Sequence, residues 1–389
     1  MRITPPSVIL AEPNYHNASK CYHNDKFDEA PGERGGGLEE GQVLKKLFYV
    51  VAALVVLISA AAALLFNAPP VQDALAKRVA TAFLEQKPQS VDGLRVVVCG
   101  SASPLGGGGE RAEACIAVVT AEHFFLFDVG ARSPQRMAQA RLPMARINGV
   151  FLTHFHSDHI AALPGVNLAS WVQGRPAALD VYGPPGVRSV VDGFNAAYAL
   201  DRGYRTAHHG AARLPPERGP MRAHAFNPGE VVWQDDLLTV TSFAVEHPPI
   251  EPAAGYRVDY RGRSVVISGD TNVADGLFAA AEGADLLFHD ALSRTVLDPM
   301  IEAATDLGRS SAGIMIDVID YHADVTLLPA RAAEAGVQLL ALYHLVPAPP
   351  NALIERMFLR GLPDDVILTR DLLTFDLPAD SDEIRITEP

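Results

Sequence analysis

The sequence has few cysteines and no long block of basic residues. Three cysteines in 389 residues are too few for a fold held together by disulfides. Cys99 and Cys115 could pair outside the cytoplasm, and buried thiols on strands are the alternative that we favour. The chain carries 32 Lys and Arg against 46 Asp and Glu, a formal net charge of −14. Because clustered cations supply affinity for nucleic-acid backbones, this composition argues against nucleic acid as a partner.

Apolar residues are abundant by contrast. They make up 48% of the chain, and charged residues only 20%, so the chain can bury a full hydrophobic core. Part of the surplus is one uncharged run of twenty residues, 47–66, which follows Lys45 and Lys46. Twenty helical residues rise about 30 Å, the thickness of a bilayer's hydrocarbon core, whereas the apolar part of a cleaved signal spans only about 7–15 residues. We therefore expect a single-pass membrane anchor.

The basic residues that flank this run indicate its orientation. Arg34, Lys45 and Lys46 precede it, while Lys77 and Arg78 follow it, a slight excess on the N-terminal side. Because cytoplasmic flanks carry the excess of Lys and Arg, we expect the N-terminus inside. The domain that follows would then lie in the periplasm or an equivalent extracytoplasmic space.

The rest of the chain divides by composition. Residues 1–42 combine scattered charge, three consecutive glycines and few clustered apolar residues, as in a disordered lead. A start codon misplaced upstream of Val43 explains them equally well. Residues 106–109 are expected to form a flexible loop. The predicted order is a disordered lead over 1–46, the membrane anchor over 47–66, a linker with a helix over 67–93, the main folded domain over 94–378 and a polar tail over 379–389.

The most informative segment is Thr153-His154-Phe155-His156-Ser157-Asp158-His159, directly after the apolar run 150–152. It places three imidazoles and one carboxylate within six positions, where a buried strand is expected to end. Nitrogen and oxygen ligands of this kind suit zinc. One short loop could thus serve two neighbouring metal ions. A solvated histidine cluster is the weaker alternative, because ligand-type residues rarely crowd so closely after a buried strand.

Three further ligand candidates follow strand-like runs downstream. His247 comes after the run 237–245, Asp270 ends an apolar run that a glycine stops, and His344 ends the run 339–343. Folds of the α/β class build their sites where strands exit into loops. Each residue alone would more often be structural than a metal ligand.

The string His-x-His-x-Asp-His, followed by these three residues in order, resembles the metallo-β-lactamase superfamily. The resemblance implies an α/β fold, an αββα sandwich with metals at a shared edge of its sheets, preceded here by one N-terminal transmembrane helix. The apolar runs fit two β-rich halves with helices between them. Strands are predicted at 94–99, 115–120, 123–128, 148–153, 237–245, 254–260, 263–268 and 338–343, and helices near 186–199, 274–282 and 329–336.

The resemblance also implies two metal ions that share one carboxylate. The first ion would be held by His154, His156 and His247, the second by Asp158, His159 and His344, and both by Asp270. Two Zn²⁺ are expected, with Mn²⁺ or Fe²⁺ as alternatives. A hydroxide between the ions would be the nucleophile, because zinc lowers the pKa of bound water from 15.7 to about 7. Asp158 is also placed among the catalytic residues.

Further fragments narrow the resemblance to the ribonuclease Z-like and arylsulfatase-like branch. They span about residues 94–350 and comprise 99–104, 182–186, 255–257, 268–271 and 288–291.

Three residues beside the ligands complete the expected site. His322 takes the place of a catalytic histidine in ribonuclease Z and could protonate the leaving oxygen. A helix-entry histidine beside Asp324 is an equal alternative. Asp128, in an Asp-x-Gly string, would orient a metal ligand from outside the metal shell, or else only end a strand in a turn. His289 would at most brace the metal shell.

Two departures from ribonuclease Z argue against tRNA processing. Only residues 258–264 separate the Gly-Tyr-Arg string from the Asp270 strand, so the long basic arm that grips tRNA is missing. Residues 68–389 carry 26 Lys and Arg (32 less 6) against 39 Asp and Glu (46 less 7), a net charge of −13. Lactamase activity is disfavoured as well, because the zinc β-lactamases do not share the strand ending Tyr343-His344-Leu345 or the string Ser268-Gly269-Asp270-Thr271 in this arrangement.

The sequence therefore predicts a membrane-anchored, dinuclear zinc hydrolase that cleaves phosphodiesters or sulfate esters of small molecules. Two alternatives are a ribonuclease Z that matures the 3′ end of tRNA and a non-catalytic metal-binding or sensing protein on the same fold. The seven filled ligand positions favour an enzyme over a sensor. A homodimer is compatible with these expectations. His208 and His209 lie in a Pro- and Arg-rich insertion, 201–222, and are left out of the metal set.

Overall fold

The computed structural model describes residues 37–85, 92–106 and 109–389. The chain divides into two compact units, with the boundary between residues 86 and 87. Most of the expected disordered lead, including Cys21, lies outside the described residues, as do residues 107 and 108 of the expected flexible loop.

The first unit contains two helices, α1 (Gly37–Asn67) and α2 (Pro69–Glu85). Helix α1 contains the uncharged run, and its large apolar side chains from Val43 to Phe66 are exposed. Among the described helices, it alone is long and apolar enough to cross a membrane by length and composition, over Gln42–Asn67 with a mean hydropathy of 2.7. It begins at Gly37, so residues 37–46, expected in the disordered lead, are helical. Pro69 starts α2, because proline is accepted in the first turn of a helix and not in its interior.

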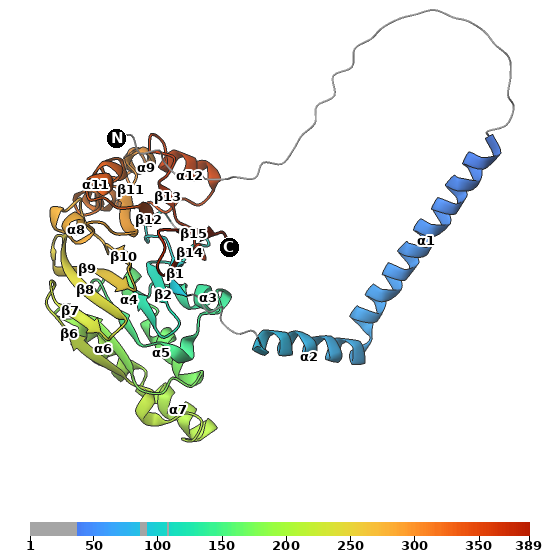
Figure 1. Ribbon diagram of the computed structural model, residues 1–389, viewed down its shortest axis with the longest axis horizontal. Helices are drawn as coiled ribbons and strands as arrows, with labels where there is room; N and C mark the ends of the chain where they lie inside the picture. Colours follow the sequence, from blue (N-terminus) through green and yellow to red (C-terminus); the bar gives the residue numbers. More distant parts are fainter. Residues whose placement is uncertain (1–36, 86–91, 107–108) are drawn as a thin grey trace, which may run out of the picture. The chain divides into compact units, whose positions relative to one another are not determined.

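The second unit is built on two β-sheets, and each combines parallel with antiparallel pairs (Figure 1). Sheet 1 has the order β15 (Arg385–Thr387), β14 (Thr374–Pro378), β1 (Gly93–Gly100), β2 (Cys115–Val119), β3 (Phe124–Phe127), β4 (Gly149–Phe151), β5 (Leu179–Gly183) and β6 (Met221–Ala225). Sheet 2 has the order β13 (Ile367–Leu368), β12 (Leu339–Val346), β11 (Leu286–Leu292), β10 (Arg263–Ile267), β9 (Ile250–Tyr260), β8 (Leu238–His247) and β7 (Val231–Gln234).

The largest core lies between the two sheets and includes Val96 of β1, Phe151 of β4 and Tyr256 of β9. Two further apolar clusters lie on the outer faces of the sheets, beneath helices. Strands such as β3 and β11 are buried on both faces, which explains their continuous apolar sequence. The helices that contribute buried residues to these outer clusters are α3 (Ser133–Gln139), α5 (Leu163–Val172) and α6 (Val187–Ala197) on sheet 1, and α8 (Asp275–Ala280), α9 (Arg294–Asp306), α11 (Leu328–Glu334) and α12 (Ala352–Phe358) on sheet 2.

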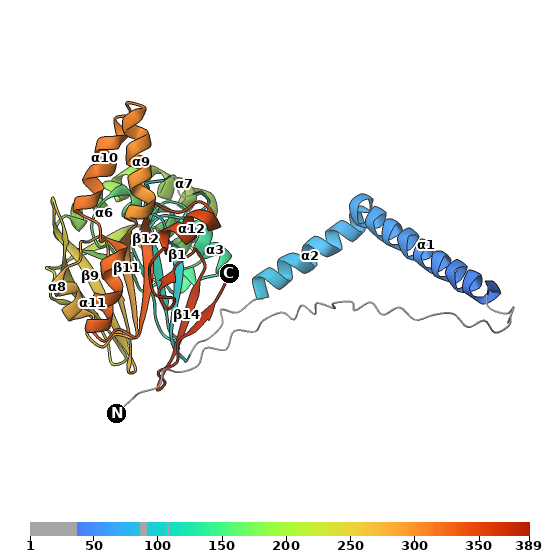
Figure 2. The ribbon, with the colours of Figure 1, turned by 90° about the horizontal axis from the view of Figure 1, so that it is seen from above.

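This layering confirms the predicted αββα sandwich (Figure 2). Several elements were not anticipated, among them the short strands β6 and β7. Residues 385–387, expected in a polar tail, form β15 and pair antiparallel with β14. The stretch 201–222 begins within α7 (Ala199–His209), a helix without buried residues that carries His208 and His209.

The β9–β10 connection is a tight hairpin. Tyr260 pairs with Arg263, so Arg261 and Gly262 alone form the turn, both with positive φ (47° and 76°). Two residues in this left-handed region make the turn that fits the twist of a β-hairpin. The structure therefore has no inserted arm between the Gly-Tyr-Arg string and the Asp270 strand.

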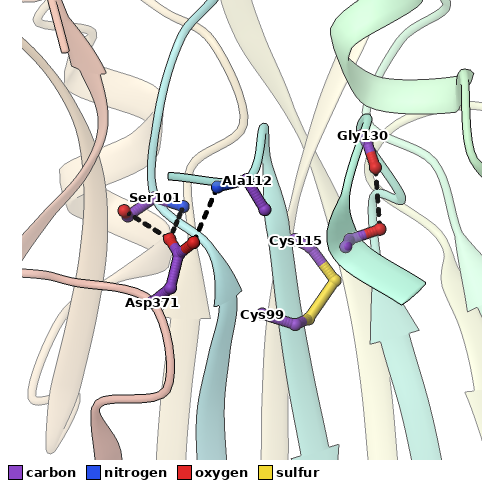
Figure 3. The surroundings of a disulfide bond; sticks show 7 residues. Cys99, Ser101, Ala112, Cys115, Gly130 and Asp371 are labelled. Carbon is purple, nitrogen blue, oxygen red and sulfur yellow. Dashed lines mark hydrogen bonds between the residues drawn. A yellow bond between two sulfur atoms is a disulfide. The ribbon is translucent and has the colours of Figure 1, made fainter. Parts of the chain in front are cut away.

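Cys99 and Cys115 form a disulfide across β1 and β2, with their Cα atoms 4.9 Å apart (Figure 3). The expectation of two buried thiols is therefore wrong. The residues between them are held at a second point, because Asp371 accepts hydrogen bonds from the Ser101 amide (3.1 Å), the Ser101 hydroxyl (2.8 Å) and the Ala112 amide (2.6 Å). These contacts fix the start of the segment that runs on to Ser103 and Leu105.

Candidate metal centre

The predicted ligands come from four parts of the chain that meet at one edge of the sandwich. After β4, the loop 152–156 leads into α4 (Ser157–Ile160), so one loop and one helical turn carry four of them. His247 is the last residue of β8, Asp270 follows β10, and His344 lies within β12. The structure brings all seven residues together in two overlapping clusters of ligand atoms, each cluster within 4.8 Å.

The first cluster joins three imidazoles to the shared carboxylate, Asp270. His154 Nε2 lies 3.0 Å from His156 Nδ1, and His247 Nε2 lies 3.4 Å from the same atom. His247 Nδ1 donates to the backbone carbonyl of Tyr321 (3.2 Å), which leaves its Nε2 without a proton and facing the cluster. Nitrogen lone pairs that converge in this way suit a cation between them.

The second cluster consists of Asp158, His159, Asp270 and His344, all buried. His344 Nε2 lies 3.0 Å from Asp158 Oδ2, and His159 Nε2 lies 3.2 Å from Asp270 Oδ1. Although these last two atoms are close, neither makes a hydrogen bond within the described residues, and both are buried. Since buried polar atoms are nearly always paired, these two atoms fit the ligands of a metal ion.

Burial and charge set the ionisation of these groups. Burial, with the neighbouring His159 imidazole, holds the pKa of His154 well below its ordinary value, and burial also lowers the pKa of His247. Both imidazoles are therefore neutral, the form that binds a metal. Burial lowers the pKa of His344 too, but Asp270 and Asp158 outweigh it and raise that pKa to about 10. A metal ion must displace a proton from His344, so acid weakens metal binding at the second cluster.

His344 reaches the cluster through a β-bulge. On β11, the neighbours Asp290 and Ala291 pair with Tyr343 and Leu345, so His344 is an extra residue in β12. Its φ of 45° lies in the left-handed region, which is uncommon for a residue with a side chain. Bulges of this kind redirect side chains next to active sites.

Asp128 and Thr153 lie behind the second cluster. The Asp128 carboxylate accepts hydrogen bonds from the amide and the hydroxyl of Thr153, both at 2.9 Å, and lies 2.8 Å from His159 Nδ1. This contact leaves His159 Nε2 for a metal. The geometry suits the orienting role expected for Asp128, which stays a prediction.

Gly269 lets the loop with Asp270 approach the loop with His154. Its φ is 65°, and a Cβ atom there would lie only 2.8 Å from the Thr153 Cβ. The Gly269 amide donates to the Tyr343 hydroxyl (3.0 Å). A residue with a side chain at this position would therefore push the two ligand loops apart.

His322 lies beside the clusters and is oriented by a carboxylate that the sequence analysis did not assign. Its Nδ1 is 2.7 Å from Asp290 Oδ2, and Asp290 is fully buried in β11. The other oxygen of Asp290 lies 3.4 Å from His344 Nδ1. Asp290 thus connects His322, the predicted acid, to His344, a predicted ligand. In the sequence, a carboxylate next to His289 in an apolar run could have indicated this residue.

His289 lies on the side of β11 that faces α8. Its ring stacks on Phe278 of α8 at 5.6 Å, in the outer layer, and its Nδ1 is 2.7 Å from the backbone carbonyl of Asp290. Neighbouring residues of a strand face opposite sides of a sheet, so only one of His289 and Asp290 can reach the metal edge. The structure gives that place to Asp290, and the supporting role expected for His289 stays a prediction.

Comparison with known proteins agrees with this geometry. A family profile described as "Beta-lactamase superfamily domain" matches residues 124–344, more than half of the chain. The chain belongs to this superfamily.

Curated relatives place this superfamily member next to ribonuclease Z. Ribonuclease Z of Mycobacterium bovis is 35% identical over 258 residues, which cover 66% of this chain and 87% of that protein. Among solved structures, the metallo-beta-lactamase fold protein YhfI from Bacillus subtilis has a TM-score of 0.51 and 18% identity over 73% of this chain and 99% of its own. The short form of human tRNase Z has a TM-score of 0.51 and 20% identity over 72% of this chain and 98% of its own. These two structures support the fold.

In this superfamily member the clusters open into a cavity of about 280 Å³. His156, Asp158, Asp270, His322 and His344 all line it, so a bound ester would meet the ligand clusters and the predicted acid together. No residue of the stretch 201–222 lines this cavity.

Proposed function

We propose that the protein is a metal-dependent phosphodiesterase. The observation that carries this proposal is the pair of clusters that share Asp270, beside a histidine held by a buried carboxylate. The relatives named ribonuclease Z support phosphodiesters over sulfate esters, because a ribonuclease cleaves a phosphodiester bond.

The metal ligands, Asp290 and His322 would each have a separate role in the reaction. The seven ligands would hold two zinc ions, which when bound supply an activated water and positive charge beside the ester. Asp290 accepts from His322 Nδ1 and thereby leaves Nε2 for the cavity. When both ring nitrogens carry a proton, Nε2 can give its proton to the departing oxygen, which otherwise leaves as a costly alkoxide.

The first prediction is a substrate preference. The zinc-loaded protein should hydrolyse bis(p-nitrophenyl) phosphate and leave p-nitrophenyl sulfate unchanged, because the relatives support phosphodiester chemistry. A chelator should abolish the activity and added zinc should restore it, measured by release of p-nitrophenolate. Hydrolysis of the sulfate alone would contradict the proposal. Two bound zinc ions with neither activity would instead favour the metal-sensing alternative.

Ribonuclease Z activity is the second candidate, and the relatives favour it directly. They weigh against the expectation that nucleic acid is not a partner. The two-residue β9–β10 turn and the acidic composition weigh in the other direction. A precursor tRNA added to the same assay decides between them: cleavage at the 3′ end, with much slower hydrolysis of small diesters, would assign the protein to tRNA maturation.

We further propose that α1 anchors the protein in a membrane, with the second unit on the extracytoplasmic side. The length and apolar composition of α1 support the anchor. The Cys99–Cys115 disulfide supports the location, because such bonds persist in oxidising compartments and are rare in the cytoplasm.

The second prediction tests this location through the thiols. Protein taken from membranes without reductant, denatured and treated with a maleimide, should gain one label at Cys21, and three labels after reduction. Gel shifts with a polyethylene glycol maleimide count the labels. A Cys21→Ser variant is the control and should gain none before reduction. Three labels without reductant would place the domain in a reducing compartment.

A further inference from the structure

Beside the ligands, His322, Ser103 and Pro104, the lining of the cavity is apolar, and we call this part of the lining the wall. Its side chains are Leu105, Ile314, Val318 and Val346, and the ring of Tyr321 adjoins them. They come from three parts of the chain: the segment after β1, the helical pair α10 (Ser311–Asp317) and η3 (Val318–Asp320), and the end of β12.

This wall is preformed. Val318 and Val346 belong to a small buried cluster with Leu292 and Leu297, and Leu105 packs against it. The Ala348 amide donates to the Leu105 carbonyl (3.0 Å), which fixes the segment after β1 to the end of β12. Helices α9 and α10 rise together from one end of the second unit (Figure 2). The wall therefore needs no folding upon binding.

Ile314 is the accessible part of the wall. It lines the cavity and is still 61% exposed, and α10 has no buried residue. Its neighbour Met315 packs towards the buried cluster, while Ile316, 51% exposed, does not line the cavity. Since burial of apolar surface is favourable, a group that covers Ile314 gains affinity.

The wall also lacks positive charge. Within the described part of the chain, no Lys or Arg lines the cavity, and the sequence has no lysine from Pro88 to Pro389. Asp317 and Asp320 add two carboxylates to the α10–η3 segment. A group with its own negative charge would meet repulsion here and no partner.

We propose that this wall binds an uncharged, apolar ester group, an alkyl chain or an aryl ring, of the phosphodiester substrate. The inference rests on the proposed phosphodiesterase function and specifies its substrate class. The phosphate would lie at the ligand clusters, and the apolar group would cover Leu105 and Ile314. With about 280 Å³, the cavity fits a group the size of a ring or a short chain.

The third prediction uses p-nitrophenyl diesters with methyl, butyl and hexyl groups on the zinc-loaded, full-length protein. The value of kcat/KM should rise with chain length, by at most roughly fourfold per methylene, until the chain outgrows the wall. Ile314→Ser should lower kcat/KM for the hexyl ester by about tenfold and flatten the dependence on length. Ile316→Ser on the same helix is the matched control and should behave as the unaltered protein.

Binding provides a readout that does not need turnover. Hexylphosphonate should bind the zinc-loaded protein more tightly than methylphosphonate in calorimetry, and Ile314→Ser should remove most of that difference. Hydrolysis of the methyl ester without any gain from longer chains, or equal affinities of the two phosphonates, would overturn the apolar site and leave the phosphodiesterase standing. Tighter binding of hexylphosphonate without hydrolysis of any diester would overturn the phosphodiesterase and keep the apolar site.

Discussion

Replacing Asp270 by alanine should remove both metal ions and with them the turnover of every ester. Asp270 belongs to all the clusters of ligand atoms found in the described residues, and its side chain is only 2% exposed. Metal ions contribute several kcal/mol to such reactions, and each 1.36 kcal/mol is a factor of ten, so kcat/KM should fall by about 10³-fold or more. Metal analysis by mass spectrometry should find less than one zinc per chain, against two in the unaltered protein.

Two further variants separate loss of metal from loss of fold. Asp270→Asn keeps the shape of the side chain and should also lose metal, because the neutral amide is a weak ligand. Asp275→Ala, on the same connection, removes a carboxylate that is 95% exposed and should change neither metal content nor rate. Two zinc ions and full activity in Asp270→Ala would disprove the shared-ligand assignment.

The His322→Ala variant should keep both zinc ions and lose turnover selectively. If His322 protonates the departing oxygen, the rate on diesters with poor leaving groups should fall by about 10²–10⁴-fold. Esters of nitrophenol need little protonation and should lose much less. Steady-state rates on methyl and nitrophenyl esters, with metal content beside them, measure this contrast.

Asp290 offers an independent check of the same role. Asp290→Asn should reproduce the selective loss, because the amide no longer holds the His322 ring as the carboxylate does. His208→Ala, on the exposed helix α7, is the control for a histidine without a role. Equal loss on both ester classes, or loss of a metal ion in His322→Ala, would assign His322 to structure instead of proton transfer.

The local part of the site could be predicted from the sequence. Residues 154–159 lie on one loop and one helical turn, so their proximity in space follows from their proximity in the chain. His247 and Asp270 could be placed because the family resemblance implies ligands in this order and each residue ends an apolar run, where strand ends of one sheet meet at the same edge. The family resemblance implied the layered fold, and the order of these runs fits it.

The remaining features depend on strand register, which one sequence does not reveal. His344 faces the clusters only because β12 bulges against β11. Asp290 was missed and His289 chosen because the pairing of β11 decides which of the two faces the metal edge. The Cys99–Cys115 disulfide likewise depends on the register of β1 against β2. Strand β15 has three exposed residues and forms through its pairing with β14.

The position of β1 in sheet 1 has a consequence for the order of synthesis and folding. Strand β1 lies between β2 and β14, and the ion pair of Arg95 with Asp376 joins residues 281 positions apart. While the ribosome is still making the chain, the first strand of the domain has only one of its two neighbours. Contacts between such distant positions slow folding, because a long loop must close first. The domain can complete its first sheet only after β14 and β15 have been synthesised, and a premature stop before β14 would leave an open strand edge that invites aggregation.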